Sequence, residues 1–158
     1  MTASRATRTA APFADPTEVF TSIWHAARAF KLALRPELER EQLTIPMFWT
    51  LHELANDGAM SVGALASACV VTPANISVAA EELVLAGLAE RSTSSKDRRV
   101  ALLTATTKGR ALHRRIWTRA AVRFSIPLRG LPRSDVQSAA RVFEHLALAA
   151  NETARREP

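Results

Sequence analysis

The segment between residues 61 and 103 constrains the fold of this chain more than any other part of the sequence. Two short helices are predicted there, one capped by Ser61 and one by Thr72, with only a tight turn between them. Two extended runs follow at residues 88–91 and 100–103, and a polar, turn-rich segment separates them. The pattern predicts two helices joined by a turn and then a β-hairpin with a long loop.

Longer segments flank this unit on both sides. Residues 1–14 are small, polar and basic without apolar periodicity, which predicts a disordered arm. Residues 15–43 carry apolar side chains at helical spacing after a cap at Asp15, with Pro36 as an interruption. A second helix capped by Thr44 opens a compact domain at 44–104, and two further helices fill residues 105–158.

The basic residues are unevenly distributed along the chain. The formal net charge is +6, yet between residues 91 and 133 the only acidic residue is Asp97. Such a run repels itself unless a negative partner lies nearby. A DNA phosphate backbone can be that partner, or the run can be a solvated helix face, and charge alone does not decide between them. The basic residues are Arg91, Lys96, Arg98, Arg99, Lys108, Arg110, Arg114, Arg115, Arg119, Arg123, Arg129 and Arg133.

Two helices and a hairpin in this order form the winged helix-turn-helix pattern. A helix fits the major groove of DNA and can read base edges there, and a basic loop beside it reaches the adjacent minor groove. From about Ile45 to Leu146 the chain resembles the MarR family of bacterial regulators. The motifs that carry the resemblance are Ala64-Leu65-Ala66, Thr72-Pro73-Ala74-Asn75-Ile76-Ser77, Leu83, Gly87-Leu88, Asp97-Arg98-Arg99, Leu103-Thr104 and Thr107-Lys108-Gly109-Arg110.

This resemblance implies a mainly α-helical fold with a small β-hairpin wing and with N- and C-terminal dimerisation helices. The sequence agrees, because the apolar stripes of the terminal helices are longer than the small winged domain can cover. By resemblance, the homodimer is a repressor that binds a pseudo-palindromic operator in double-stranded DNA. A small aromatic acid or phenolic ligand would release it by favouring another spacing of the two DNA-reading helices.

Ten residues are predicted to contact DNA. The resemblance implies that Arg98 or Arg99 enters the minor groove and that Asp97 orients it through a salt bridge. The second helix of the pair departs from the family pattern, because no Lys or Arg occurs from Thr72 to Leu88. The predicted DNA-binding residues are Ser61, Thr72, Ala74, Asn75, Ser77, Val78, Lys96, Asp97, Arg98 and Arg99.

The acidic residues Glu81 and Glu82 on that second helix keep an alternative open. A winged-helix module can bind protein partners and have little affinity for DNA. An enzyme is not expected, because the sequence contains no Gly-rich phosphate loop, paired catalytic carboxylates or nucleophile elbow.

A small set of aromatic and basic residues is the candidate effector site. An arginine and a histidine beside flat rings can hold a carboxylate over an aromatic ligand. The alternative is that Trp24 and Phe48 belong to the core and that His25 and Arg28 lie on the surface. The predicted effector-binding residues are Trp24, His25, Arg28, Phe48 and His52.

The remaining candidate sites lead to no cofactor or metal prediction. Cys69 lies beside Val70 and Val71 and is expected to be a small buried residue. The four histidines show no close pairing of the His-x-x-x-His kind, so no metal site is expected. No apolar run reaches the roughly 18 residues of a membrane span, and the start lacks a secretory signal. With a single cysteine, the expected location is the cytoplasm, with no membrane partner.

Overall fold

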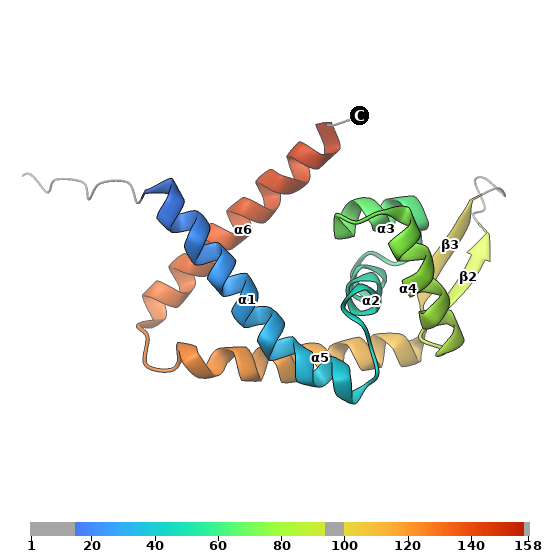
Figure 1. Cartoon of the computed structure of the whole chain (residues 1–158), viewed down its shortest axis with the longest axis horizontal. Helices are drawn as coiled ribbons and strands as arrows, with labels where there is room; N and C mark the ends of the chain where they lie inside the picture. Colours follow the sequence, from blue (N-terminus) through green and yellow to red (C-terminus); the bar gives the residue numbers. More distant parts are fainter. Residues whose placement is uncertain (1–14, 94–99, 157–158) are drawn as a thin grey trace, which may run out of the picture.

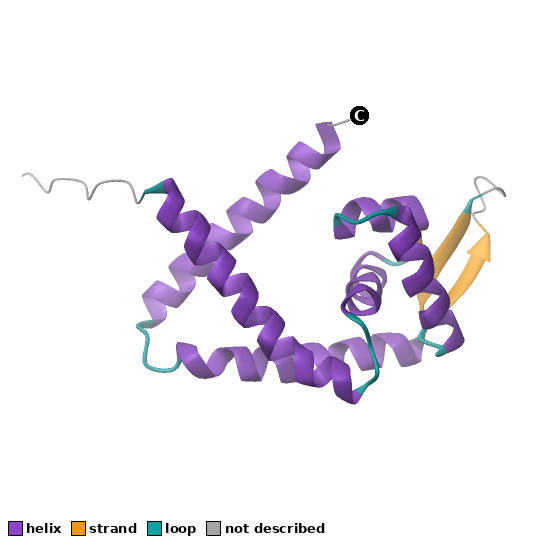
Figure 2. Ribbon diagram, in the orientation of Figure 1, coloured by secondary structure: helices purple, strands orange, loops and turns teal. Residues whose placement is uncertain are grey.

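The computed structural model describes residues 15–93 and 100–156. It is mainly helical, with a small antiparallel sheet, as the sequence predicts (Figures 1 and 2). The elements are α1 (Pro16–Arg40), α2 (Ile45–Asp57), β1 (Met60–Ser61), α3 (Val62–Cys69), α4 (Pro73–Leu85), β2 (Ala89–Thr93), β3 (Ala101–Ala105), α5 (Thr107–Ser125), the 3-10 helix η1 (Ile126–Leu128) and α6 (Arg133–Arg156).

Side-chain caps fix the starts of the helices. Asp15 accepts a hydrogen bond from the amide of Thr17, and Thr44, Ser61, Thr72 and Thr106 each accept one from the amide three residues later. Each such cap contributes about 1 kcal/mol. The predicted caps at Asp15, Thr44, Ser61 and Thr72 are therefore confirmed.

The end of the first helix differs from the expectation. Helix α1 ends at Arg40, and Gln42 adopts a positive φ of 55°, which a continuing helix does not allow. Pro36 lies inside α1 without ending it. The sequence alone placed the interruption at Pro36 and carried the helical segment to residue 43.

The sheet contains one more strand than the sequence predicts. The strand order is β1-β3-β2, with β3 in the centre and both pairs antiparallel. Leu103 pairs with Arg91 on one side and with Met60 on the other. Because β1 has only two residues, it has no alternating pattern that a sequence could display.

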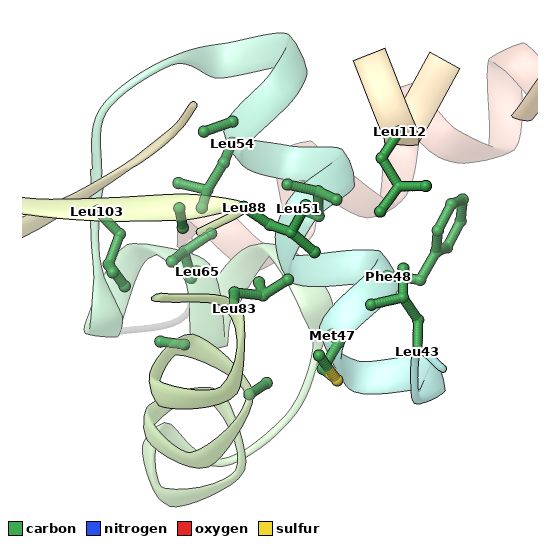
Figure 3. Packing of buried hydrophobic residues seen from close by; sticks show 14 of the residues in the cluster. Leu43, Met47, Phe48, Leu51, Leu54, Leu65, Leu83, Leu88, Leu103 and Leu112 are labelled. Carbon is green, nitrogen blue, oxygen red and sulfur yellow. The ribbon is translucent and has the colours of Figure 1, made fainter. Parts of the chain in front are cut away.

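The core lies where α2, α3, α4 and α5 meet the sheet (Figure 3). Phe48 and Leu51 of α2, Leu65 of α3 and Leu83 of α4 are among the fully buried side chains. This packing makes α2, α3, α4 and the hairpin one compact body, which sits over one half of the long α5 (Figure 1).

The first half of α1 and the whole of α6 lie apart from this body, whereas Leu34 and Leu38 in the second half of α1 belong to the core (Figure 1). Phe20 and Trp24 of α1 are largely exposed. Helix α6 is exposed almost throughout its described side chains, including Val142, Phe143 and Leu146. These apolar stripes are not covered within one chain, as the sequence analysis expects of helices that pack against a second copy.

Candidate DNA-binding surface

The turn between α3 and α4 sets the angle of the second helix. The two helices are bent by 111° relative to each other, within the usual range of a helix-turn-helix. Val70 ends α3 in the left-handed conformation, with φ 54° and ψ 49°. Thr72 then caps α4 through the amide of Asn75 at 3.4 Å. The cap leaves the first turn of α4 at the surface, with Ala74 and Asn75 exposed.

Helix α4 has one buried and one exposed face. Ile76, Ala79, Ala80 and Leu83 are buried. Of the predicted DNA-contacting residues on α4, Ala74, Asn75 and Val78 lie on the exposed face, and Val78 is 59% exposed.

The predicted hydroxyl-bearing residues are used by the fold itself. Ser61 accepts a hydrogen bond from the amide of Ala64 at 3.2 Å, and Ser77 donates to the carbonyl of Pro73 at 2.9 Å. Thr72 caps α4 in the same way. Their structural role is therefore to hold the two helices. The O–H groups of Ser61 and Thr72 can still donate to a phosphate oxygen, whereas Ser77 already donates its hydrogen to Pro73.

The wing strands run beside α4. Arg91 of β2 lies 3.7 Å from the carboxylate of Glu81 on α4, and both side chains are about half exposed or more. This pair offsets part of the negative charge on α4. The wing residues Lys96, Asp97, Arg98 and Arg99 lie outside the described residues.

Comparison with known proteins agrees with this geometry. Residues 41–100 match the model of the MarR family, and they span the elements from α2 to β2 and end just before β3. Residues 41–100 are therefore a winged helix-turn-helix region of the MarR family type. No curated protein sequence gives a significant match.

Solved MarR-like structures cover most of the chain. NadR, solved in complex with 4-hydroxyphenylacetate, is 22% identical with a TM-score of 0.69, over 89% of this chain and 98% of its own. BpsR of Bordetella bronchiseptica, whose DNA binding is regulated by 6-hydroxynicotinic acid, is 22% identical with a TM-score of 0.67, over 87% and 98%. A MarR family protein of Bacillus stearothermophilus is 18% identical with a TM-score of 0.73, over 85% and 94%.

The Thr107-Lys108-Gly109-Arg110 motif joins the winged domain to α5. Lys108 donates to the carbonyl of Ala86 at 2.8 Å, and Arg110 donates to the carbonyl of Ala105. A Cβ at Gly109 would lie 2.0 Å from the carbonyl oxygen of Leu88, so only glycine fits. The motif therefore holds the winged domain against α5, and both of its basic residues donate hydrogen bonds to backbone carbonyls.

The basic run on α5 also has partners inside the chain. Arg115 forms two hydrogen bonds with Glu41, the residue that follows α1, at 3.2 and 2.9 Å. Arg119 and Arg123 lie 3.7 and 3.4 Å from Glu37, which is only 3% exposed. These three arginines therefore have negative partners within the chain, the carboxylates of Glu37 and Glu41. The phosphate interpretation of the run stays a prediction. The sequence separation of 74 to 86 residues concealed these pairs.

The predicted effector residues do not form one group in the single chain. Phe48 is fully buried among the rings of Trp49, His52, His113 and Trp117. Trp24, His25 and Arg28 are exposed on α1, and none of the ring contacts among the described residues involves Trp24. The aromatic residue that joins α1 to this cluster is Phe30, which stacks on Trp49 at 5.9 Å. In the sequence, the i, i+4 spacing of Phe30 and Leu34 could have placed Phe30 on the buried face of α1.

Two histidines that are far apart in the sequence meet in this cluster. Nδ1 of His52 lies 2.9 Å from Nε2 of His113, and the amide nitrogen of Asn56 lies 3.1 Å from Nε2 of His52. One neutral tautomer satisfies both contacts: the Asn56 amide donates to Nε2 of His52, and Nδ1–H of His52 donates to Nε2 of His113. Burial lowers the pKa of both imidazoles, and the charge of His52 lowers that of His113 further.

The remaining candidates show no sign of reactivity or metal binding. Cys69 is half-buried, and burial, helped by the charge of Glu53, raises the pKa of its thiol to about 11. Such a thiol carries little thiolate at neutral pH. Within residues 15–93 and 100–156, no three His, Cys, Asp or Glu side chains are grouped as metal ligands. In the same part of the chain, no single helix is long and apolar enough to cross a membrane.

Proposed function

We propose that this chain is a homodimeric transcriptional repressor of the MarR family that binds a pseudo-palindromic operator. The observation that carries the proposal is the exposed face of α4, where Ala74, Asn75 and Val78 stand free on a helix anchored by four buried residues. Asn75 can pair with adenine and Val78 can contact a thymine methyl group. Phosphate neutralisation comes mainly from Lys96, Arg98 and Arg99 of the wing.

The apolar terminal helices support the homodimer. The stripes on α1 and α6 include Phe20, Trp24, Phe143 and Leu146, all exposed in the single chain. Light scattering at micromolar concentration should report twice the chain mass of 17.2 kDa. A monomer under these conditions would contradict both the dimer and the symmetric operator.

Selection and sequencing of the DNA fragments that the protein retains tests the function directly. A symmetric dimer should select two inverted half-sites about one helical turn, or roughly 10 bp, apart. Footprinting that protects one unrepeated half-site would contradict the proposal.

The protein-partner alternative rests on the lack of Lys and Arg on α4 and on its exposed Glu81 and Glu82. Duplex DNA binding that weakens steeply with salt favours the repressor, because each phosphate contact contributes about 0.9 to the slope of log K against log salt. An absence of duplex binding at low salt favours the protein partner.

We propose a small aromatic acid or phenol as the effector. NadR and BpsR, both similar in fold, are described with ligands of this class. On this chain, Trp24, His25 and Arg28 offer a ring and two cationic or polar groups on one exposed stretch of α1, and His52 is only half-buried. Phe48 is fully buried, so it would not touch the ligand and would instead pack behind the ring of His52. Arg28→Ala should abolish the response to a confirmed effector, and an unchanged response would rule out this placement.

A further inference from the structure

A cavity of about 450 Å³ lies between α1 and the second half of α5. Its polar wall consists of Arg40, Arg119 and Arg123, with Glu37 at the base and Thr118 at the side. Its apolar wall consists of Val122 and Ile126, both more than half exposed. The volume is in the range of small-molecule sites.

The charges in this cavity are not balanced. Arg40, Arg119 and Arg123 converge on Glu37, and Arg119 also contacts Glu41, which pairs with Arg115. Four arginines thus face two carboxylates, so two positive charges are in excess. Glu37 uses both oxygens: Oε2 lies 3.1 Å from Arg40 and 3.7 Å from Arg119, and Oε1 lies 3.4 Å from Arg123. Each arginine has five N–H donors, and only one nitrogen of each contacts Glu37. Among residues 15–93 and 100–156, no other carboxylate or carbonyl contacts the remaining nitrogens of Arg40, Arg119 and Arg123 apart from Glu41 on Arg119, so these donors can bind an anion.

The buried carboxylate also pre-organises the arginines. Glu37 is 3% exposed, and the three arginine side chains are 43 to 55% exposed. Their guanidinium groups are therefore held at one end and open to solvent at the other. Arg119 is the most loosely held, because its two carboxylate contacts, to Glu37 and Glu41, are both 3.7 Å long.

This cavity lies on the opposite flank of α5 from the aromatic cluster. His113 and Trp117 contact Phe48, and Phe124 contacts Phe30. Arg119 and Arg123, two and six residues beyond Trp117, project on the other side of the helix toward Glu37. A ligand here would not share contacts with the proposed effector residues Trp24, His25, Arg28, Phe48 and His52.

We infer that this cavity binds a small organic dianion, a phosphate monoester or a dicarboxylate, with a compact apolar body. The anionic group takes the free donors of Arg40, Arg119 and Arg123, with the Thr118 hydroxyl as a further donor. The apolar body rests on Val122 and Ile126. The inference does not depend on DNA binding, and its test contains no DNA.

Isothermal titration calorimetry of the full chain in a phosphate-free buffer of fixed ionic strength tests the site. Phenyl phosphate and phthalate are the probes, and phenol is the neutral control. We expect each chain to bind one molecule of a dianionic probe. Any binding of phenol should be the same in the parent and in Arg119→Gln. Binding of either dianion supports the site, and the tighter probe names the anionic group that it prefers.

Variants locate the bound probe. Arg119→Gln should weaken binding on the order of tenfold, as expected for one charge-assisted contact. The matched control Arg114→Gln removes the same charge from an exposed position of α5 that does not line the cavity and should bind like the parent. Val122→Trp fills the cavity without touching an ion pair and should also abolish binding, which keeps the test valid if Arg119→Gln folds poorly.

Three results would overturn the inference. The first is that neither dianion binds, and the second is that Arg119→Gln and Val122→Trp both bind like the parent. The third is that Arg28→Gln removes binding while the two cavity variants do not, which would place the probe at the proposed effector site.

Discussion

Helices α4 and α5 differ in charge and in how their charges are partnered. Helix α4 contains no Lys or Arg and presents its exposed face beside the wing, whereas α5 carries a dense run of arginines. Three of those arginines are engaged by Glu37 of α1 and by Glu41, which follows α1. Within the basic run, the wing residues are proposed to meet DNA, whereas Arg115, Arg119 and Arg123 of α5 pair with carboxylates of the same chain. Charge density indicates a DNA surface only where the charges have no partner in the chain.

The largest expected effect is a loss of operator affinity when the wing arginines are removed. Changing Arg98 and Arg99 together to Ala should cost about 2–5 kcal/mol of operator binding, because two charged contacts are lost. The matched change of Arg115 and Arg119 to Ala should leave the salt slope of operator binding close to the parent value. Salt titrations of both variants measure this. If the wing variant binds like the parent while Asn75→Ala abolishes binding, α4 dominates and the division of labour is wrong.

The junction between the wing and α5 should tolerate no side chain at Gly109. Gly109→Ala places a Cβ 2.0 Å from the Leu88 carbonyl oxygen, so the backbone must shift. We expect a loss of unfolding free energy of about 1–3 kcal/mol or more, measured by urea denaturation. Gly63→Ala is the control: it lies in α3, its Cβ would meet nothing within 4 Å, and it should stabilise by about 0.5–1 kcal/mol. Equal effects of the two changes would contradict the tight junction.

We expect the ion pairs between α1 and α5 to contribute to the free energy of unfolding. Glu37→Ala leaves three half-exposed arginines facing one another, and we expect a loss of about 1–3 kcal/mol in urea denaturation. Glu39→Ala breaks an exposed i, i+4 pair with Arg35 at 2.7 Å and should cost only about 0.3–0.5 kcal/mol. A Glu37→Ala cost as small as that of Glu39→Ala would show that α1 does not neutralise α5.

The smallest expected effect is the pH dependence of the contact between α2 and α5. Burial lowers the pKa of His52 and His113 below the ordinary value of 6.5. The unfolded chain therefore takes up protons at a higher pH than the folded chain does. The stability that the two neutral histidines contribute is complete above about pH 6.5 and is lost as pH falls through their lower folded-state pKa values. His113→Gln should flatten unfolding stability against pH between about 7 and 5. The exposed His145→Gln should leave the profile unchanged, and a profile that His113→Gln does not alter would contradict the pair.

The sequence by itself determined the helix starts, the helix-turn-helix and the hairpin. These features depend on contacts within about four residues: the hydroxyl of Thr72 reaches the amide of Asn75, and that of Ser61 reaches the amide of Ala64. Local hydrogen bonds of this kind follow from neighbouring residue types alone. The exposed face of α4 followed in the same way from the spacing of its apolar residues.

The tertiary structure alone decided which charges and rings meet. Arg123 reaches Glu37 across 86 residues, and His52 reaches His113 across 61. The two-residue strand β1 exists only because β3 is there to pair with it. These contacts depend on where α1 and α2 cross α5, and the crossing is set by the shared core, which no local pattern encodes.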